Sequence, residues 1–201
     1  MKRFWKPHFE KNDLKVKTKK ILYSGYLHLV HYNIKFRLFK GKWSNFINRD
    51  LILTNNCISV LLFDPCKKLI LFTEQFRIGN INNNPWTLEI ISGAINNNSG
   101  IIRTTIKEIK EETDSNYLDI IYLMQCQTSP GISSEKIHLF IGIFNAKKAN
   151  KIFGLKKEGE DIKTHLYSLE QSLFFIKHGL IQHSPTIIAI LWLKNYYYDI
   201  L

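Results

Sequence analysis

The segment from Gly93 to Ser115, GAINNNSGIIRTTIKEIKEETDS, constrains the fold of this 201-residue chain more than any other. A loop of small and polar residues opens it, and an amphipathic helical pattern follows. The helix is predicted to carry an apolar stripe at helical spacing, formed by Ile101, Ile102, Thr105, Ile106 and Ile109. Because successive residues turn by about 100°, Glu108 and Glu112 should lie one above the other at the edge of this stripe, with Glu111 just outside it.

The two stacked acids are unfavourable in a simple helix. They occupy its last turns, where the helix dipole disfavours negative charge, and like charges four residues apart repel. A divalent cation held between Glu108 and Glu112 would turn that repulsion into ligation, because Mg²⁺ prefers oxygen ligands. The alternative is a solvated helix face, on which Lys107 and Lys110 balance the acids. The spacing alone leaves both interpretations open.

The overall charge is strongly basic, with a formal net charge of +11. Such a charge could attract nucleic acid or a phosphorylated ligand. However, the sequence has no dense basic block and no arginine-rich stripe, and its heavy use of Lys, Asn and Ile offers a purely compositional source for the charge. We therefore expect no nucleic-acid partner. The length suits one full core, or one domain with a small accessory subdomain.

The cysteines and the apolar runs favour a cytoplasmic protein. Cys57, Cys66 and Cys126 are odd in number, widely separated and outside any CxxC pattern, which is typical of reduced thiols. The basic start of the chain is not followed by the apolar run of a secretory signal. The apolar run from Ile187 to Leu193 is too short to span a bilayer, so no membrane association is expected.

The first half of the chain is predicted to be mainly β. Residues 1–20 are polar and without clear period, and are expected to form an irregular arm. Residues 21–54 should form a meander with a turn at Lys40-Gly41-Lys42, and residues 57–63 and 69–75 a hairpin around Asp64-Pro65. A short strand over residues 86–91 leads into the segment described above.

The second half alternates between strands and helices. Strands are predicted over residues 119–128, 136–145 and 161–168, with a turn at Ser129-Pro130-Gly131 and a long polar loop over residues 146–160. A helix over residues 169–178 should stop at Gly179, and a final helix should begin at Ser184 as N-cap with Pro185 in its first position. The predicted fold class is α+β, a mixed sheet flanked by helices.

The segment from Gly93 resembles the Nudix box, which runs Gly, five residues, Glu, seven residues, Arg-Glu, an aliphatic residue, any residue, Glu-Glu, any residue, Gly and an aliphatic residue. Gly93 opens the box, and Glu108-Ile109-Lys110-Glu111-Glu112 matches its core at the right spacing. Four positions depart from the pattern: Ser99 replaces the first Glu, Lys107 replaces Arg, and Asp114-Ser115 replaces Gly-aliphatic.

The flanking motifs resemble those of bacterial ADP-ribose pyrophosphatases, a branch of the Nudix hydrolases, over most of residues 21–193. The motifs occur in that branch's order: Phe63-Asp64-Pro65, Glu74-Gln75-Phe76-Arg77, Pro85-Trp86-Thr87-Leu88-Glu89, Ser129-Pro130-Gly131 with Ser134-Glu135, and Glu158-Gly159-Glu160-Asp161-Ile162. The resemblance implies an αβα sandwich with an N-terminal antiparallel β subdomain. Residues 1–54 would form the arm and a dimerisation subdomain, and residues 55–201 the hydrolase domain.

The resemblance also implies a role for individual residues. The carbonyl of Ser92, with Glu108, Glu112 and Glu160, would bind Mg²⁺, with Mn²⁺ as an alternative, and Glu158 would be the general base. The implied substrate-binding residues are Tyr26, Leu27, Arg49, Arg77, Ala94, Ser129, Pro130, Gly131 and Glu135, and the box is supported by Gly93, Lys107 and Glu111. By residue type alone, the arginines could equally be ion-pair partners, Glu158 and Glu160 a solvated acidic loop, Tyr26-Leu27 strand packing, and Ser129-Pro130-Gly131 an ordinary hairpin turn.

The implied activity is hydrolysis of ADP-ribose to AMP and ribose 5-phosphate by a homodimer, with the N-terminal strands exchanged or packed across the interface. One alternative keeps the chemistry and changes the substrate to GDP-mannose or another nucleoside diphosphate sugar. Another is a catalytically weakened protein that still binds nucleotide. The departures from the box predict an active enzyme with weakened metal affinity, because Lys107 offers a point charge where arginine would offer a bidentate fork.

Overall fold

The chain forms two compact units. The computed structural model describes residues 5–95, 100–146, 151–155, 157 and 159–200. The first unit comprises Met1–Thr54 together with Ser129–Glu135, and the second comprises Asn55–Thr128 with Lys136–Leu201. Within the described residues, no helix has the length and apolar character needed to cross a membrane.

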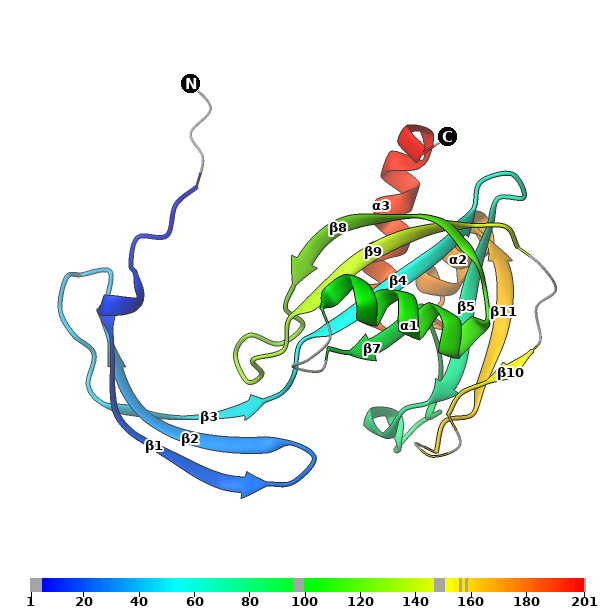
Figure 1. Cartoon of the computed structure of the whole chain (residues 1–201). Coiled ribbons are helices and arrows are strands. Elements are labelled where there is room, and N and C mark those ends of the chain that lie inside the picture. The colour runs from blue at the N-terminus through cyan, green and yellow to red at the C-terminus, as the bar shows by residue number, and fades with distance from the viewer. Residues whose placement is uncertain (1–4, 96–99, 147–150, 156, 158, 201) are drawn as a thin grey trace. The chain divides into compact units, whose positions relative to one another are not determined.

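The first unit is a three-stranded antiparallel sheet in the order β1-β2-β3 (Figure 1). Its strands are β1 (Leu14–Ser24), β2 (His28–Phe36) and β3 (Ile47–Leu53). The segment 129–135 joins this sheet, because Ser133 bridges to Ile52 and the N–H of Ile52 donates to the carbonyl of Ile132 at 2.8 Å. Every residue of β1 is exposed, so the sheet has little core of its own.

The expectation of an irregular arm over residues 1–20 is wrong from Lys11 onward. A short 3₁₀ helix, η1 (Lys11–Asp13), precedes β1, whose first seven residues fall within the expected arm. The strand was missed because both of its faces are exposed, so its sequence lacks the apolar alternation of a half-buried strand. Its lysines pack instead on aromatic rings: the Nζ atom of Lys15 lies 4.8 Å from the ring centroid of Trp43.

The second unit is built on an eight-stranded sheet. The path β10-β11-β5-β4-β9-β8 carries two further short strands, with β6 paired to β5 and β7 paired to β4. The strands are β4 (Cys57–Asp64), β5 (Leu69–Phe76), β6 (Trp86–Glu89), β7 (Ile91–Ala94), β8 (Tyr117–Cys126), β9 (Ile137–Phe144), β10 (Ile152–Phe153) and β11 (Ile162–Ser168). A 3₁₀ turn, η2 (Ile78–Asn80), follows β5. The β4–β9 pair is parallel and the other pairs are antiparallel, which confirms the predicted mixed sheet.

Helices cover both faces of this sheet, as Figure 1 shows. Helix α1 (Ile101–Thr113) packs on one face, and α2 (Leu169–Lys177) and α3 (Ser184–Ile200) pack on the other. Strand β4 alternates between the two layers: Leu61 faces the α2–α3 side, whereas Val60 and Leu62 face α1. The layered α+β architecture expected from the sequence is therefore confirmed.

The packed face of α1 agrees only in part with the predicted stripe. Ile102 and Ile106 are exposed by 53% and 36%, whereas Thr104 and Thr105 are buried with Glu112. The threonines can be buried because each hydroxyl donates to a backbone carbonyl one turn earlier, at 3.3 Å and 2.9 Å. Thr105 and Ile109 of the predicted stripe are buried and Ile101 packs on the same cluster, so the stripe is confirmed at these positions and wrong at Ile102 and Ile106.

Two other details concern the segments around the site. The predicted loop over residues 146–160 contains the two-residue strand β10, which pairs with β11 and is too short to show any period. Helix α1 ends at Asp114, which adopts a left-handed conformation with φ of 48°, and the N–H of Asp114 donates to the carbonyl of Lys110 at 3.0 Å. The box pattern has glycine at this position, the residue that takes this conformation most easily.

Candidate active site

Gly93 and Glu108 form the first part of the site. Strand β7 pairs with β4 so that Gly93 lies opposite Ile58 and Ser92 opposite Ser59. A Cβ atom at Gly93 would overlap the carboxyl group of Glu108, so the Glu108 side chain lies directly across this backbone. Any larger residue at this position would therefore displace the Glu108 carboxylate from its place over β7.

Glu112 is the buried acid of the site. Its side chain is only 3% exposed, and its Oε2 atom has no hydrogen-bond partner among the described residues. Burial raises its pKa well above the ordinary 4.5, and the neighbouring Glu108 raises it further, against the opposing effects of Arg77 and a hydrogen bond from the Ser92 backbone. A buried carboxylate oxygen with no partner, next to a second carboxylate, has the character of a cation ligand.

Arg77 is held by Glu89. The Nε atom of Arg77 donates to Oε1 and Oε2 of Glu89 at 3.2 Å and 3.1 Å, and its Nη2 atom donates to Oε2 at 2.9 Å. Burial lowers the pKa of the Arg77 guanidinium, but the Glu89 contact and the charges of Glu112 and Glu160 outweigh it, so that the pKa is raised. Arg77 is thus the ion-pair partner that its residue type allowed, and it also faces the charges of the site acids.

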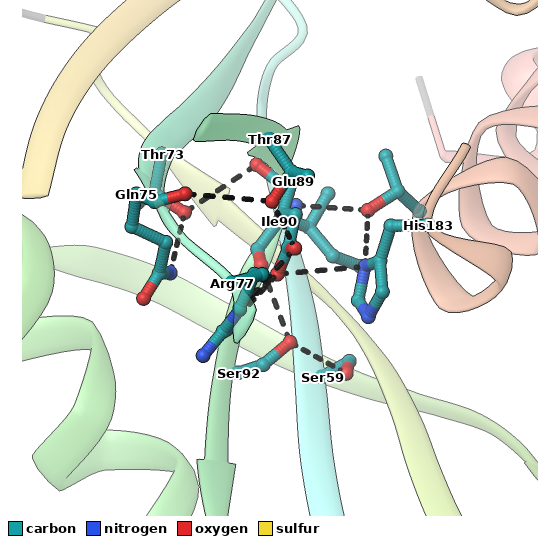
Figure 2. Close-up of polar contacts among 10 residues, drawn as sticks. Ser59, Thr73, Gln75, Arg77, Thr87, Glu89, Ile90, Ser92 and His183 are labelled. Atoms are coloured by element: carbon teal, nitrogen blue, oxygen red, sulfur yellow. Dashed lines mark hydrogen bonds and ion pairs between the residues drawn. The ribbon is translucent and has the colours of Figure 1, made fainter. Parts of the chain in front are cut away.

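Glu89 has further partners from two other directions. The Thr87 hydroxyl donates to its Oε1 atom, and the Nδ1 atom of His183 lies 3.9 Å from its Oε2 atom. Figure 2 shows Glu89 between the Arg77 guanidinium and the His183 ring. Burial raises the pKa of Glu89, but His183 and Arg77 lower it by more, so this carboxylate stays ionised. Glu89 belongs to the motif Pro85-Trp86-Thr87-Leu88-Glu89, which gives it no role of its own, and no pattern in the sequence points to His183.

Lys107 replaces the arginine of the box pattern and pairs with acids of its own helix. Its Nζ atom lies 2.9 Å from Oε2 of Glu111 and 3.7 Å from Oε1 of Glu108, and its side chain is 54% exposed. A single ammonium therefore faces two carboxylates, where a guanidinium could form parallel hydrogen bonds.

Glu160 is positioned by the chain just before β11. Its Oε2 atom accepts a hydrogen bond from the Leu155 N–H at 3.0 Å, and Gly154, with φ of 107°, packs closely against it. The predicted general base Glu158 lies outside the described residues. Among the residues that are described, no group of three or more His, Cys, Asp or Glu side chains could hold a metal ion. The candidate ligands here are the Glu108–Glu112 pair with Ser92 beside it.

The other predicted substrate residues belong to the first unit, apart from Ala94 on β7. Tyr26, 98% exposed, and Leu27 lie in the turn between β1 and β2. Arg49 is exposed on β3 and its Nη1 atom donates to the carbonyl of Asn48 at 2.8 Å. A final group lies in the segment that joins β3: Ser129, Pro130, Gly131 and Glu135. The structure therefore brings together Ser92, Gly93, Glu108, Glu112, Arg77 and Glu160 in the second unit.

A pocket of about 280 Å³ lies at the C-terminal end of α1. It is lined by residues that include Thr113, Asp114, Phe144, Lys151 and Phe153, and none of the predicted site residues lines it. This pocket is therefore separate from the acid pair.

Known proteins resemble the chain over nearly its whole length, although no family model matches it. An ADP-ribose pyrophosphatase of Haemophilus influenzae is 29% identical, over 97% of this chain and 95% of the relative. A GDP-mannose pyrophosphatase of Escherichia coli is 29% identical over 73% of this chain and 78% of the relative. Among solved structures, an ADP compounds hydrolase aligns with a TM-score of 0.66 at 12% identity, over 91% of this chain and 95% of that one, which shows the shared fold.

Relatives that are 30% identical show the family. An ADP-ribose pyrophosphatase of Escherichia coli O6:H1 is 30% identical over 188 residues, which make up 92% of this chain and 90% of the relative. The layered fold, the glycine beneath Glu108 and the buried Glu112 agree with the same branch. The chain belongs to the ADP-ribose pyrophosphatase branch of the Nudix hydrolases.

Proposed function

We propose that this protein hydrolyses the diphosphate of ADP-ribose to AMP and ribose 5-phosphate. The observation that carries the proposal is the acid pair on α1. The Glu108 carboxylate lies over Gly93, and Glu112 is buried beside it with an oxygen that has no hydrogen-bond partner among the described residues. The relatives named ADP-ribose pyrophosphatase support this substrate.

The acid pair fits a divalent metal ion, Mg²⁺ or alternatively Mn²⁺. The carboxylates of Glu108 and Glu112 and the carbonyl of Ser92 would hold it, because these cations prefer oxygen ligands. A bound cation would neutralise the diphosphate oxygens and make the phosphorus more electrophilic. Glu160, whose charge acts on Glu112, would assist as a further acid of the same site.

The remaining residues would bind the substrate and activate the attacking water. Arg77 would orient the diphosphate, because its guanidinium stays charged and carries several N–H donors. Glu158 would accept the proton of the attacking water, as a general base on a loop. Arg49, Tyr26, Leu27, Ala94, the 129–131 turn and Glu135 would complete substrate binding, by analogy with the family.

A second candidate substrate is GDP-mannose, or another nucleoside diphosphate sugar. The observation in its favour is the similarity to GDP-mannose pyrophosphatases, which is 29% over 73% of the chain. The acid pair would serve either substrate, because both contain the same diphosphate. The residues that bind the terminal sugar would then decide between them.

The test is a substrate panel read by chromatography. Purified protein with millimolar Mg²⁺ should release AMP from ADP-ribose faster than GMP from GDP-mannose, and Glu112→Gln and Glu158→Gln should each abolish release. Faster hydrolysis of GDP-mannose would select the alternative substrate. Tight ADP-ribose binding without any AMP release would contradict hydrolysis and favour a nucleotide-binding role.

The replacement of the box arginine by Lys107 predicts weakened metal affinity. Lys107→Arg should lower the Mg²⁺ concentration needed for half-maximal activity several-fold, because a guanidinium can bind Glu108 and Glu111 through parallel hydrogen bonds. A Mg²⁺ titration of both proteins measures this. Full activity of the unaltered protein at micromolar Mg²⁺ would show that Lys107 has its own compensated role.

We also propose a homodimer and a cytoplasmic location. The exposed β1 supports association through the first unit, because a strand without a core on either face lacks the burial that usually stabilises a sheet. The three cysteines are odd in number and lie outside any CxxC pattern, which supports a reducing compartment.

A further inference from the structure

Glu89 is a buried carboxylate to which the proposed reaction assigns no role. It lies at the end of β6, is 2% exposed, and binds Arg77 from the end of β5. Its neighbour Thr87 donates to it from the same strand, and His183, which immediately precedes α3, approaches its Oε2 atom at 3.9 Å. The carboxylate therefore contacts residues from three parts of the second unit.

The geometry of the Arg77 contact leaves one side of the guanidinium available. Nε and Nη2 are both bound to Glu89, and no hydrogen-bond partner of Nη1 lies among the described residues. The Arg77 side chain is 42% exposed, whereas that of Glu89 is 3% exposed. One edge of the fork thus binds a buried carboxylate, whereas the Arg77 side chain as a whole remains partly exposed.

Three carboxylates act on the charge of Arg77. Glu112 and Glu160 both act on the guanidinium, in addition to Glu89. Loss of the contact to Glu89 would leave Arg77 attracted mainly to Glu112 and Glu160, and the Oε2 atom of Glu112 has no hydrogen-bond partner among the described residues. A bidentate carboxylate contact fixes both the position and the plane of a guanidinium.

A second chain of contacts fixes Glu89 in turn. The Thr186 hydroxyl accepts a hydrogen bond from the Ile90 N–H at 3.0 Å and lies 2.8 Å from the Nδ1 atom of His183. Helix α3 is thereby joined to the backbone that directly follows Glu89, as Figure 2 shows. The position of the carboxylate is thus determined by the fold and does not depend on Arg77 alone.

We propose that Glu89 is a positioning residue, which holds Arg77 away from the metal-binding acids and presents its Nη1 edge to the diphosphate of the substrate. The inference rests on the proposed function, because Arg77 is a substrate residue only if a diphosphate binds there. Glu89 would then affect the affinity for substrate only through Arg77, without contacting the substrate or the metal itself.

The test is a double-mutant cycle. Glu89→Gln keeps the shape of the side chain and removes its charge, and it should raise KM for ADP-ribose about tenfold with a smaller change in kcat. In an Arg77→Lys background the same substitution should add less than twofold, because Glu89 acts through Arg77. Glu74→Gln is the matched control, since it removes a carboxylate bonded to His165 at 2.8 Å on the same sheet, and it should leave KM unchanged.

Additive effects of Glu89→Gln and Arg77→Lys would overturn the proposal, because they would show that Glu89 acts on the fold in general. A second measurement does not need activity. In ¹⁵N-labelled protein, the Nε–H signal of Arg77 should be protected from solvent exchange and should lose that protection in Glu89→Gln but not in Glu74→Gln. If the unaltered protein hydrolyses no diphosphate, the proposed function fails separately, and an unchanged Arg77 signal in Glu89→Gln would still refute the positioning role.

Discussion

Gly93 is the residue on which the place of Glu108 most directly depends. A methyl group at this position would occupy the space of the Glu108 carboxyl group. We predict that Gly93→Ala lowers kcat/KM for ADP-ribose by roughly a hundredfold, because displacing a metal-binding carboxylate by about one ångström is enough for such a loss. The measurement is steady-state AMP release, together with circular dichroism to confirm folding.

Gly79 provides the matched control. A Cβ atom there would meet nothing within 4 Å, so Gly79→Ala should leave kcat/KM unchanged within about twofold. Equal activity of the two alanine variants would contradict the close approach of Glu108 to β7.

Glu112 is destabilising without a cation. Its pKa is raised above 4.5, so the folded metal-free protein binds a proton more tightly there than the unfolded chain does, and stability is lost as pH rises through the raised pKa. We predict that Glu112→Gln abolishes hydrolysis but stabilises the metal-free protein at pH 8 by roughly 1–3 kcal/mol. Urea unfolding in EDTA measures this, and the gain should disappear near pH 4; an unchanged or lower stability at pH 8 would contradict it.

Some residues of the site could be predicted from the sequence and others could not. Glu108 and Glu112 could be paired from their helical spacing, because both lie on one element. The ion pair of Arg77 with Glu89 joins the ends of two strands, and the His183 contact adds a segment nearly a hundred positions further along the chain. The first contact depends on the pairing of β5 with β6 and the second on the packing of α3, and neither leaves a local pattern in the sequence.

At the scale of elements, Asp64 joins two loops. Its side chain, 1% exposed, accepts hydrogen bonds from the N–H groups of Lys67 at 2.9 Å and Ala146 at 2.7 Å. It thereby joins the turn between β4 and β5 to Ala146, which follows β9. Burial raises the pKa of Asp64, but the backbone hydrogen bonds lower it by more, so its value lies below the ordinary 3.8.

We predict that Asp64→Asn destabilises the protein by roughly 1–3 kcal/mol at pH 7, because charge-assisted hydrogen bonds to two backbone donors are weakened. With a lowered pKa, the contribution of Asp64 is fully present above the unfolded pKa and is lost as pH falls through the folded one. The difference between the two proteins in urea unfolding should therefore narrow below pH 4. A constant difference down to pH 2 would contradict the ionised role of Asp64.

The elements that could be predicted are those with a visible period or a strong stop. The β4–β5 hairpin, β8, β9 and α2 all lie within a few residues of their expected bounds. Gly179, with φ of 70°, ends α2 as expected. Strand β1 has no buried face and β10 has only two residues, so neither leaves a pattern that local reasoning can detect.

At the scale of the whole molecule, the first unit exposes much apolar surface. Ile21 is 60% exposed, Leu22 49% and Tyr23 59%, all on β1. Surfaces of this kind commonly mark protein–protein contacts. We predict that Ile21→Lys converts the proposed dimer to a monomer in sedimentation velocity. ADP-ribose hydrolysis should fall at least tenfold, because the substrate residues of the first unit would no longer be held against a second subunit.

The control replaces a residue that is already charged. Lys20→Glu on the same strand should leave the sedimentation coefficient of the dimer unchanged, because no apolar surface is removed. A protein that is monomeric before any substitution, and active as such, would contradict the dimer.

The division into units was only partly visible in the sequence. In the structure, the N-terminal segment of the first unit ends at Thr54 and the second unit begins at Asn55. The segment Ser129–Glu135 also belongs to the first unit, through the bridge of Ser133 to Ile52. A contact between positions so far apart leaves no local signal, and the turn at Ser129-Pro130-Gly131 could be predicted only as a turn.

The end of α1 at Asp114 has a consequence for how such proteins are recognised. An L-residue with a side chain holds φ of 48° here, so the surrounding structure imposes the bend that glycine would have made effortless. The left-handed backbone conformation is present here without the glycine that the box pattern has at this position. A member of this family can therefore have the expected backbone conformation without the motif residue, and distant members are better identified by comparing structures than by matching the motif.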